Sequence, residues 1–449
     1  MPTNQKAWYS LSYLAYAISI VFLAINGRPD NFAPLIFIWS ICFICFFILL
    51  RSFDFINPGF IWWLVPLIIK LVLIFISPQL SNDFIRFWWD GYLSCHGINP
   101  YLWSPHETLQ YFPNADFIGP LQKNYGSLNS QEYHTVYPPL SQLLYYLNTI
   151  IAGEKLLLFS IGMKFFYLMA DIVTLFYLLK ILKQLNLPLY GAFLYFGNPL
   201  CLIELQGNLH TEQFMLLFLV MALYYSMRSS DINTAWTLAG SVLSKMNSLL
   251  LTPLFVNKNS GLLTYLTIFS SAFFALFILY LPTANSAGGF ANSIGLYFQK
   301  FEFNSLFYYI MRDLLFEHKY YISKINLGWI LLACFGLCAS MIYLISFFRK
   351  NQGPFPFSAA WWILVIFYCL STTVHPWYIC PLIIMGIFYL PVSTTIWSFF
   401  IFLSYSHYDP EFESYYRILS GSGYLSFFVA IYLEQKGKIG FGFCKRVIV

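Results

Sequence analysis

Two carboxylates and one guanidinium fall close together in the segment SNDFIRFWWDG, residues 81–91. If this segment is helical, Asp83, Arg86 and Asp90 lie on one face, because they are spaced by one helical turn each. Both carboxylates can then flank the guanidinium, and a carboxylate held in this way can act as a general base toward a hydroxyl group. The alternative is an interfacial helix in which the two acids only neutralise Arg86 and the neighbouring tryptophans lie in the aromatic belt of the membrane.

A second group of ionisable residues lies in the segment ELQGNLHTE, residues 204–212. Glu204, His210 and Glu212 fall between two apolar stretches, and ionisable groups at membrane level are costly enough to mark functional sites by default. A structural hydrogen-bonding role for His210 is the alternative. The segment lacks H-x-x-x-H or a comparable ligand spacing, so a divalent metal is not expected there.

Two further side chains could contact an anion. Lys245 lies in LSKMNSLLLTP, where two arms of about ten residues, each rising about 1.5 Å per residue, would carry it about half-way into a membrane. Snorkelling of the ammonium toward an interface is the alternative. His375 precedes Pro376, which suits the first turn of a helix, so His375 would stand at the helix entrance as a phosphate or hydroxyl contact.

The composition decides which solvent surrounds these residues. Of 449 residues, 59% are hydrophobic and 10% are charged, whereas soluble proteins carry about 45–50% apolar and about 25% charged residues. A soluble protein is thereby excluded. The formal net charge of +5 is small and scattered, so no nucleic-acid partner is expected. Most of the nine cysteines lie inside apolar runs, which favours packing over a disulfide framework.

Apolar stretches of about 20 residues, the length that spans a bilayer, recur along the chain. We predict an all-α polytopic membrane protein of about 12–14 transmembrane helices, organised as a single membrane domain over residues 1–449. The predicted spans lie near residues 8–26, 33–50, 59–77, 161–183, 189–206, 211–227, 261–282, 327–348, 358–373, 376–392, 394–406 and 418–434. Two stretches are ambiguous. Residues 139–153 are predicted to form an interfacial or re-entrant helix, and residues 234–256 two short half-helices that meet near Lys245.

Basic residues predict the orientation, because cytoplasmic loops are enriched in Lys and Arg. Arg51, Lys180, Lys183, Arg228 and Arg349 share one side only if neither ambiguous stretch crosses the membrane. A first loop, residues 78–136, and a second, residues 283–326, then face outward. The second loop carries basic residues, but acids nearly balance them and long loops translocate largely regardless of charge. We expect an inner-membrane protein whose site faces the periplasm or exterior.

Taken together, the motifs resemble a known superfamily. S-N-D-F-I-R-F-W-W-D-G, followed by G-I-N-P-Y, Y-P-P-L, G-N-L-H-T-E, F-E-F-N-S-L-F and T-V-H-P-W-Y, is similar to membrane glycosyltransferases of the GT-C superfamily. The similarity is greatest to bacterial polyprenol-phosphate-mannose-dependent mannosyltransferases and covers roughly residues 78–410. Such relatives often show S-D-D where this chain has Ser81-Asn82-Asp83, and an Asp in place of Glu212. Asn82 leaves Asp83 as the only acid of that pair, which argues against a metal-binding D-x-D.

The resemblance implies transfer of a hexose, mannose in the family, from a polyprenyl-phosphate sugar to a glycan, lipid or protein acceptor at the outer membrane face. Asp83 would be the general base, and Arg86 and Asp90 would orient it. No cofactor or metal would be required, because basic side chains can stabilise a leaving phosphate. The expected phosphate contacts are Lys245, His375 and, as a weaker candidate, Arg312. The expected sugar or acceptor contacts are Glu204, Asn208, His210, Glu212, Asn304 and Tyr137.

Other classes of function stay open at this level. A transporter or flippase of lipid-linked sugars would also be polytopic, although transporters usually show internal repeats and polar groups near the midplane. A glycan polymerase or ligase would differ only in what it transfers. A non-catalytic subunit of an envelope complex is a further alternative.

Overall fold

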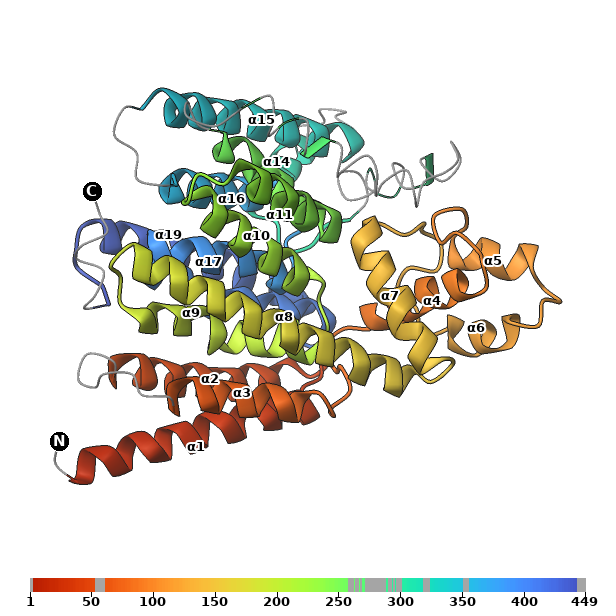
Figure 1. Cartoon of the computed structure of the whole chain (residues 1–449), viewed down its shortest axis with the longest axis horizontal. Coiled ribbons are helices and arrows are strands. Elements are labelled where there is room, and N and C mark those ends of the chain that lie inside the picture. Colours follow the sequence, from red (N-terminus) through yellow and green to blue (C-terminus); the bar gives the residue numbers. More distant parts are fainter. Residues whose placement is uncertain are drawn as a thin grey trace.

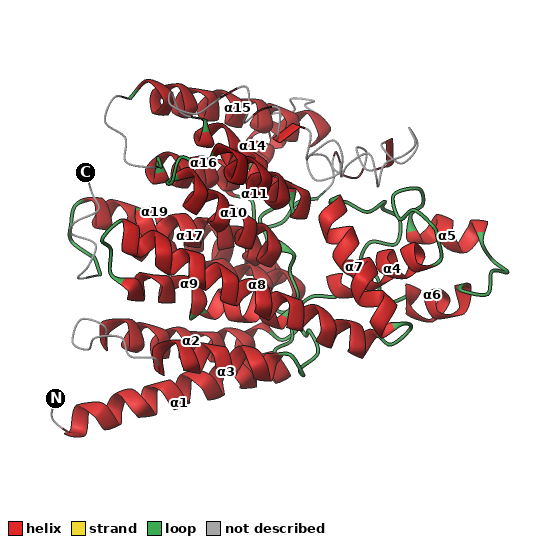
Figure 2. Ribbon diagram, in the orientation of Figure 1, coloured by secondary structure: helices red, strands yellow, loops and turns green. Residues whose placement is uncertain are grey.

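The computed structural model describes residues 3–52, 61–256, 301–317, 324–349 and 355–441, with isolated positions between residues 262 and 295. Within these ranges the fold is built from helices and connecting loops (Figure 2). The extended pairing found there is an isolated parallel bridge between Phe303 and Thr373. The predicted all-α fold is confirmed.

The main body consists of helices that run roughly side by side in stacked layers (Figure 1). α1 packs against both α2 and α3, and α10 packs against both α8 and α11. One large hydrophobic core joins these helices to α16–α19. The helices of the body are α1 (Thr3–Asn26), α2 (Phe32–Ser52), α3 (Ile61–Leu73), α8 (Leu156–Gln184), α9 (Phe193–Phe196), α10 (Glu212–Ser226), α11 (Asp231–Ser244), α14 (Leu306–Glu317), α15 (Lys324–Phe348), α16 (Phe357–Leu370), α17 (Cys380–Phe388), α18 (Pro391–Phe400) and α19 (Tyr416–Gln435).

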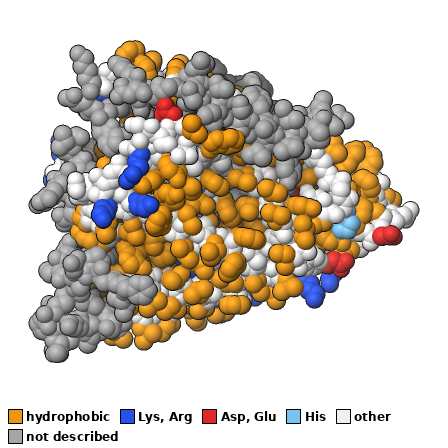
Figure 3. All heavy atoms as spheres, viewed as in Figure 1, with side chains coloured by type: hydrophobic (Ala, Val, Ile, Leu, Met, Phe, Trp, Pro, Cys, Tyr) orange, Lys and Arg blue, Asp and Glu red, His pale blue; other side chains and the backbone are white. Residues whose placement is uncertain are grey.

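Three of the described helices are long and apolar enough to cross a membrane, namely Phe32–Arg51, Leu156–Gln184 and Leu327–Phe348. Shorter apolar helices accompany them. In the view of Figure 3, hydrophobic side chains cover the middle of the molecule and charged side chains lie toward its two ends. The predicted polytopic membrane protein is confirmed in class, and the count of about 12–14 spans stays a prediction.

A second group of helices extends beyond the ends of the layers (Figure 1). It comprises α4 (Asp83–Cys95), α5 (Pro105–Tyr111), α6 (Ile118–Tyr125) and α7 (Pro139–Ala152), and a smaller hydrophobic core joins it to the start of α8. α7 begins with Pro139 at its first position, where a missing N–H costs nothing. The predicted helix over residues 139–153 is therefore confirmed, and α4 shows that the first loop begins with a helix.

Gly91 allows α4 and α7 to approach closely. A Cβ atom at this position would lie 2.4 Å from the hydroxyl oxygen of Thr149 and 2.6 Å from the backbone oxygen of Tyr145. The second distance involves rigid backbone, so a side chain here would push the two helices apart.

The span predicted over residues 189–206 is not one continuous helix. The segment is divided into a 3-10 helix (Leu189–Ala192), the single turn of α9, and a π-helix (Cys201–Gly207). Pro199 has no N–H and disfavours helical geometry at Asn198, whose side-chain oxygen accepts the N–H of Leu200 at 2.9 Å instead. π-Helical turns occur frequently at functional sites, and this one carries Glu204.

The predicted break near Lys245 is confirmed. α11 ends at Ser244, and a 3-10 helix (Met246–Phe255) follows. Lys245 itself is extended, with φ −158° and ψ 131°. The span predicted at 261–282 lies largely outside the described residues, as does the second external loop apart from residues 301–317, the start of α15 and a few isolated positions.

Candidate functional site

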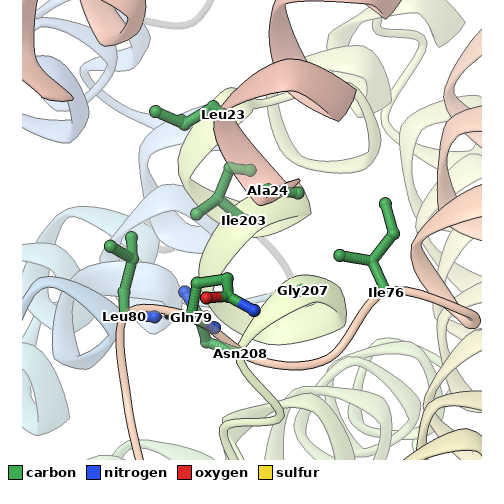
Figure 4. Close-up of a pocket in the computed structure, with 8 residues that line it drawn as sticks. All are labelled: Leu23, Ala24, Ile76, Gln79, Leu80, Ile203, Gly207 and Asn208. Atoms are coloured by element: carbon green, nitrogen blue, oxygen red, sulfur yellow. Dashed lines mark hydrogen bonds between the residues drawn. The ribbon is translucent and has the colours of Figure 1, made fainter. Parts of the chain in front are cut away.

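The site lies where four segments meet: the start of α4, the turn after the π-helix, the break at Lys245, and the turn that precedes Pro376. Each segment is a place where a helix begins or ends, so polar side chains and unpaired backbone groups converge there. A small crevice lies behind it, lined by Leu23, Ala24, Ile76, Gln79, Leu80, Ile203, Gly207 and Asn208 (Figure 4).

Asp83 is the first residue of α4, where the helix dipole favours a negative charge. Its Oδ1 accepts a hydrogen bond from Nδ2 of Asn129 at 2.7 Å, and its side chain is 20% exposed. Burial raises the pKa of the Asp83 carboxyl above its usual range, while Asn129 and the charge of Lys245 offset part of that rise. Asp83 is thus a partly open carboxylate with an increased affinity for a proton.

His210 and Glu204 lie directly behind Asp83. Nδ1 of His210 is 3.7 Å from Oδ2 of Asp83, and Nε2 of His210 is 3.3 Å from Oε2 of Glu204. The hydroxyl of Tyr405 donates to Oε1 of Glu204 at 2.8 Å, and Nδ2 of Asn208 donates to Oε2 at 3.3 Å. Glu204 is therefore held from both sides.

Asn208 connects this group to the crevice. Its side-chain oxygen accepts the backbone N–H groups of Gln79 at 3.3 Å and Leu80 at 3.2 Å. Figure 4 shows Asn208 beside these two residues. The bonds fix the orientation of the Asn208 amide, so its nitrogen faces Glu204.

The two histidines of the site share one aromatic stack. His210 lies 3.5 Å from the ring of Trp377, nearly parallel to it, and Trp377 stacks in turn on His375 at 4.5 Å. Burial lowers the pKa of His210 well below its usual value and that of His375 to about 3, and the charge of Lys245 acts in the same direction. Both imidazoles are therefore neutral at pH 7, and each offers one N–H donor and one acceptor.

Lys245 has a buried partner, as expected for a cation at this position. Its Nζ lies 2.5 Å from Oε1 of Glu212, the first residue of α10, and 5.0 Å from the centre of the Tyr378 ring. The Glu212 side chain is fully buried, whereas that of Lys245 is 18% exposed. One side of the ammonium thus faces a carboxylate while part of it remains open.

Arg86 and Asp90 form a separate buried pair. Nε of Arg86 donates to Oδ1 of Asp90 at 2.8 Å, and its Nη1 donates to the carbonyls of Tyr133 at 2.8 Å and Ser130 at 3.1 Å. Among the described side chains, no ion pair joins Arg86 to Asp83, so the expected arrangement with a carboxylate on each side is wrong. Arg86 instead ties α4 to the segment that carries Asn129.

For three further expected site residues, the contacts are with groups other than Asp83 and Lys245. Arg312 pairs with Glu302 and with Asp313 at 3.1 Å. Asn304 is buried, and its Nδ2 donates to the carbonyl of Val374 at 3.2 Å, next to His375.

Tyr137 packs edge-on against Phe87, with ring centres 4.8 Å apart. The residues that the structure brings around Asp83 and Lys245 are Glu204, Asn208, His210, Glu212 and His375.

The sequence did not predict several residues that contact the site. Asn129 and Tyr405 are 46 and 201 residues away from the groups they contact, and nothing in their local sequence indicates this pairing. A buried pair between Lys70 and Asp171, 2.5 Å apart, was also missed. Here a signal exists, because each of these ionisable residues interrupts an apolar stretch.

The described residues contain no group of three or more His, Cys, Asp or Glu side chains arranged to hold a metal ion. Comparison with known protein families gives the following match. Residues 51–258 match the model of the MptA_B family, described as alpha-(1->6)-mannopyranosyltransferase, N-terminal domain. A comparison with curated proteins gave no match. The matched range contains Asp83, Asn129, His210 and Lys245, and it confirms the resemblance inferred from the motifs.

Proposed function

We propose that the chain transfers mannose from a polyprenyl-phosphate donor to a hydroxyl of a glycan, lipid or protein acceptor. The match of residues 51–258 to an alpha-(1->6)-mannopyranosyltransferase N-terminal domain supports this proposal. The transfer takes place at the external face of the inner membrane. Asp83 is the general base, and Lys245 binds the phosphate that leaves.

One observation carries this proposal. Asp83 and Lys245 have opposite charge, their side chains are each about one-fifth exposed, and both are backed by fully or nearly fully buried partners. Each of the two can therefore meet a substrate from the open side. A base and a cation close enough to influence each other electrostatically suit a reaction in which a proton leaves one substrate and negative charge develops on another.

The step balances with these two groups. The acceptor oxygen forms a bond to the anomeric carbon while its proton moves to Asp83. The bond from the anomeric carbon to the phosphate oxygen breaks, and its electron pair stays on the polyprenyl phosphate. The raised pKa of Asp83 suits this role, because it increases the affinity of the carboxylate for the proton that it takes up.

Lys245 can serve the phosphate without giving up Glu212, because an ammonium has three donors. His375 is neutral and would add a hydrogen bond rather than a charge. A donor with one phosphate needs less neutralisation than a nucleotide diphosphate, so the proposed reaction requires no divalent metal. Arg312 already pairs with Glu302 and Asp313, so we do not assign it to the phosphate.

The sugar would lie against the wall formed by Asn208, His210 and Glu212. Their polar atoms largely face one another or Lys245 and Glu204. The expected sugar contacts from this wall are accordingly few, and we propose that its main role is to shape the site.

The direction of the helices supports the proposed orientation. α10 starts at Glu212 in the site, and Arg228 follows its other end at Ser226. α8 starts near α7 and ends at Gln184, after Lys180 and Lys183 (Figure 1). Basic residues thus lie a helix length away from Asp83, and by the positive-inside rule this arrangement supports an exterior position for Asp83.

The test uses purified protein in lipid vesicles with an acceptor pool extracted from membranes. Three donors are compared: polyprenyl-phosphate mannose, polyprenyl-phosphate glucose and a nucleotide-diphosphate mannose, each with and without a chelator. We expect transfer from the first donor alone, unchanged by the chelator. Transfer from the nucleotide sugar, or transport of the lipid-linked sugar without transfer, would overturn the proposal.

A further inference from the structure

Asp83 is the open end of a row of polar side chains drawn from distant parts of the chain. The row runs from Asp83 on α4 through His210 in the turn after the π-helix to Glu204 on the π-helix, and ends at Tyr405. It consists of a carboxylate, an imidazole, a buried carboxyl group and a phenol, all within the site of the proposed function.

Burial separates the roles of these groups. The Asp83 side chain is 20% exposed, whereas those of His210 and Glu204 are 2% and 0% exposed. A substrate that approaches from the exposed side contacts Asp83, and His210 and Glu204 lie behind Asp83. Any effect of His210 and Glu204 on the reaction therefore passes through Asp83.

The geometry points to His210 and Glu204 as positioning residues, which hold Asp83 in the orientation that receives the acceptor proton. This inference rests on the proposed function. It differs from the expectation that the two residues bind sugar hydroxyls.

Neighbouring side chains fix the arrangement. Trp377 stacks on the His210 ring at 3.5 Å and sets the plane of the imidazole, whose Nδ1 lies toward Asp83 and whose Nε2 lies toward Glu204. Tyr405 and Asn208 hold both oxygens of Glu204. Catalytic triads likewise use a buried carboxyl group to fix the tautomer of an imidazole. Here the fully buried Glu204 is the protonated partner: its O–H donates to Nε2, so the neutral imidazole carries its N–H at Nδ1, which faces Asp83.

The distance of 3.7 Å from Nδ1 to Oδ2 is longer than a hydrogen bond. Catalytic hydrogen bonds are often long without substrate and shorten in the substrate complex. In the shortened form the Nδ1–H group donates to the ionised Asp83 and favours its charged state. Other charged or titratable groups that influence the pair are Lys245, Glu212 and His375.

The decisive variant is His210→Phe, which preserves a ring on Trp377 but removes the N–H group. We expect kcat to fall about 10²-fold, the loss typical of a misplaced reacting group, with little change in the KM for the donor. The acidic limb of the rate profile should move to higher pH, because Asp83 loses a donor to its charged form. His96→Phe is the matched control. It also replaces an imidazole with a ring, but His96 is the C-cap residue of α4, at the opposite end of this helix from Asp83, so kcat and the acidic limb should stay unchanged.

A double variant separates positioning from sugar binding. In protein that already carries Asp83→Asn, adding His210→Phe should cause no further loss, because residues that act as a unit are not additive. A further loss in the double variant, or a wild-type kcat and pH profile for folded His210→Phe, would overturn the inference. Full activity of Asp83→Asn alone would instead overturn the proposed function.

Discussion

The pair between Lys245 and Glu212 offers a test that separates a functional cation from a structural one. Lys245→Met keeps the length of the side chain and removes its charge. It leaves Glu212 fully buried at the start of α10, without the partner that now lies 2.5 Å away. Removing one member of a buried ion pair generally lowers the free energy of unfolding by about 3–5 kcal/mol. The single variant should therefore be both less stable and less active.

A second substitution separates these two effects. In Lys245→Met/Glu212→Gln the buried charge is gone, so most of the lost stability should return. The small remaining cost comes from the helix dipole at the start of α10, where a carboxylate contributes about 0.3–1 kcal/mol. Activity should not return, because the leaving phosphate still lacks its cation, and loss of one such contact costs about 10²–10³-fold in rate.

The assay combines thermal unfolding in detergent with initial rates of mannosyl transfer from polyprenyl-phosphate mannose. Glu212→Gln alone is the matched control, since it removes the same carboxylate but retains Lys245. We expect this control to keep substantially more activity than the double variant. If the double variant regained the transfer rate of the wild type, Lys245 would serve only to neutralise Glu212, and its assignment to the phosphate would be refuted.

Three other predictions follow from the contacts around α4. Asn129→Leu removes the hydrogen-bond donor to Oδ1 of Asp83 and so raises the pKa of Asp83 further. The acidic side of the pH profile of kcat/KM should therefore move to higher pH. An unchanged pH profile would show that Asp83 does not control it. Arg86→Met leaves Asp90 as an unpaired buried carboxylate, and unfolding measurements should show a loss of about 3–5 kcal/mol; an unchanged stability would contradict this. Gly91→Ala forces α4 away from α7 and should cost about 1–3 kcal/mol by the same measurement, whereas a neutral effect would mean that the helices can separate freely.

Features of the fold that depend on local sequence were predictable. A long apolar stretch must be a helix in a membrane, because its backbone polar groups have no other partners there. The same reasoning located α7 and the break at Lys245, where polar residues interrupt the apolar pattern. It failed at residues 189–206, because hydropathy alone does not register how Pro199 divides a helix.

The site was predictable in its residue types but only partly in its pairings. Asp83, His210 and Lys245 stood out as polar residues at the ends of apolar stretches. The spacing of Asp83, Arg86 and Asp90 predicted one ion-paired face, yet only Asp90 contacts Arg86, because the first residue of α4 turns toward Asn129 instead. Which partner Asp83 contacts depends on segments distant in sequence, and helical spacing carries no information about those segments.

The central claim is that Asp83 takes the proton of the acceptor. The most direct measurement is single-turnover transfer from polyprenyl-phosphate mannose by Asp83→Asn, together with binding of that donor. The amide has the size of the carboxylate but cannot take up the proton, so transfer should fall by about 10²–10⁴-fold while donor binding stays close to that of the wild type. A folded Asp83→Asn protein that transfers mannose at the wild-type rate would contradict the account.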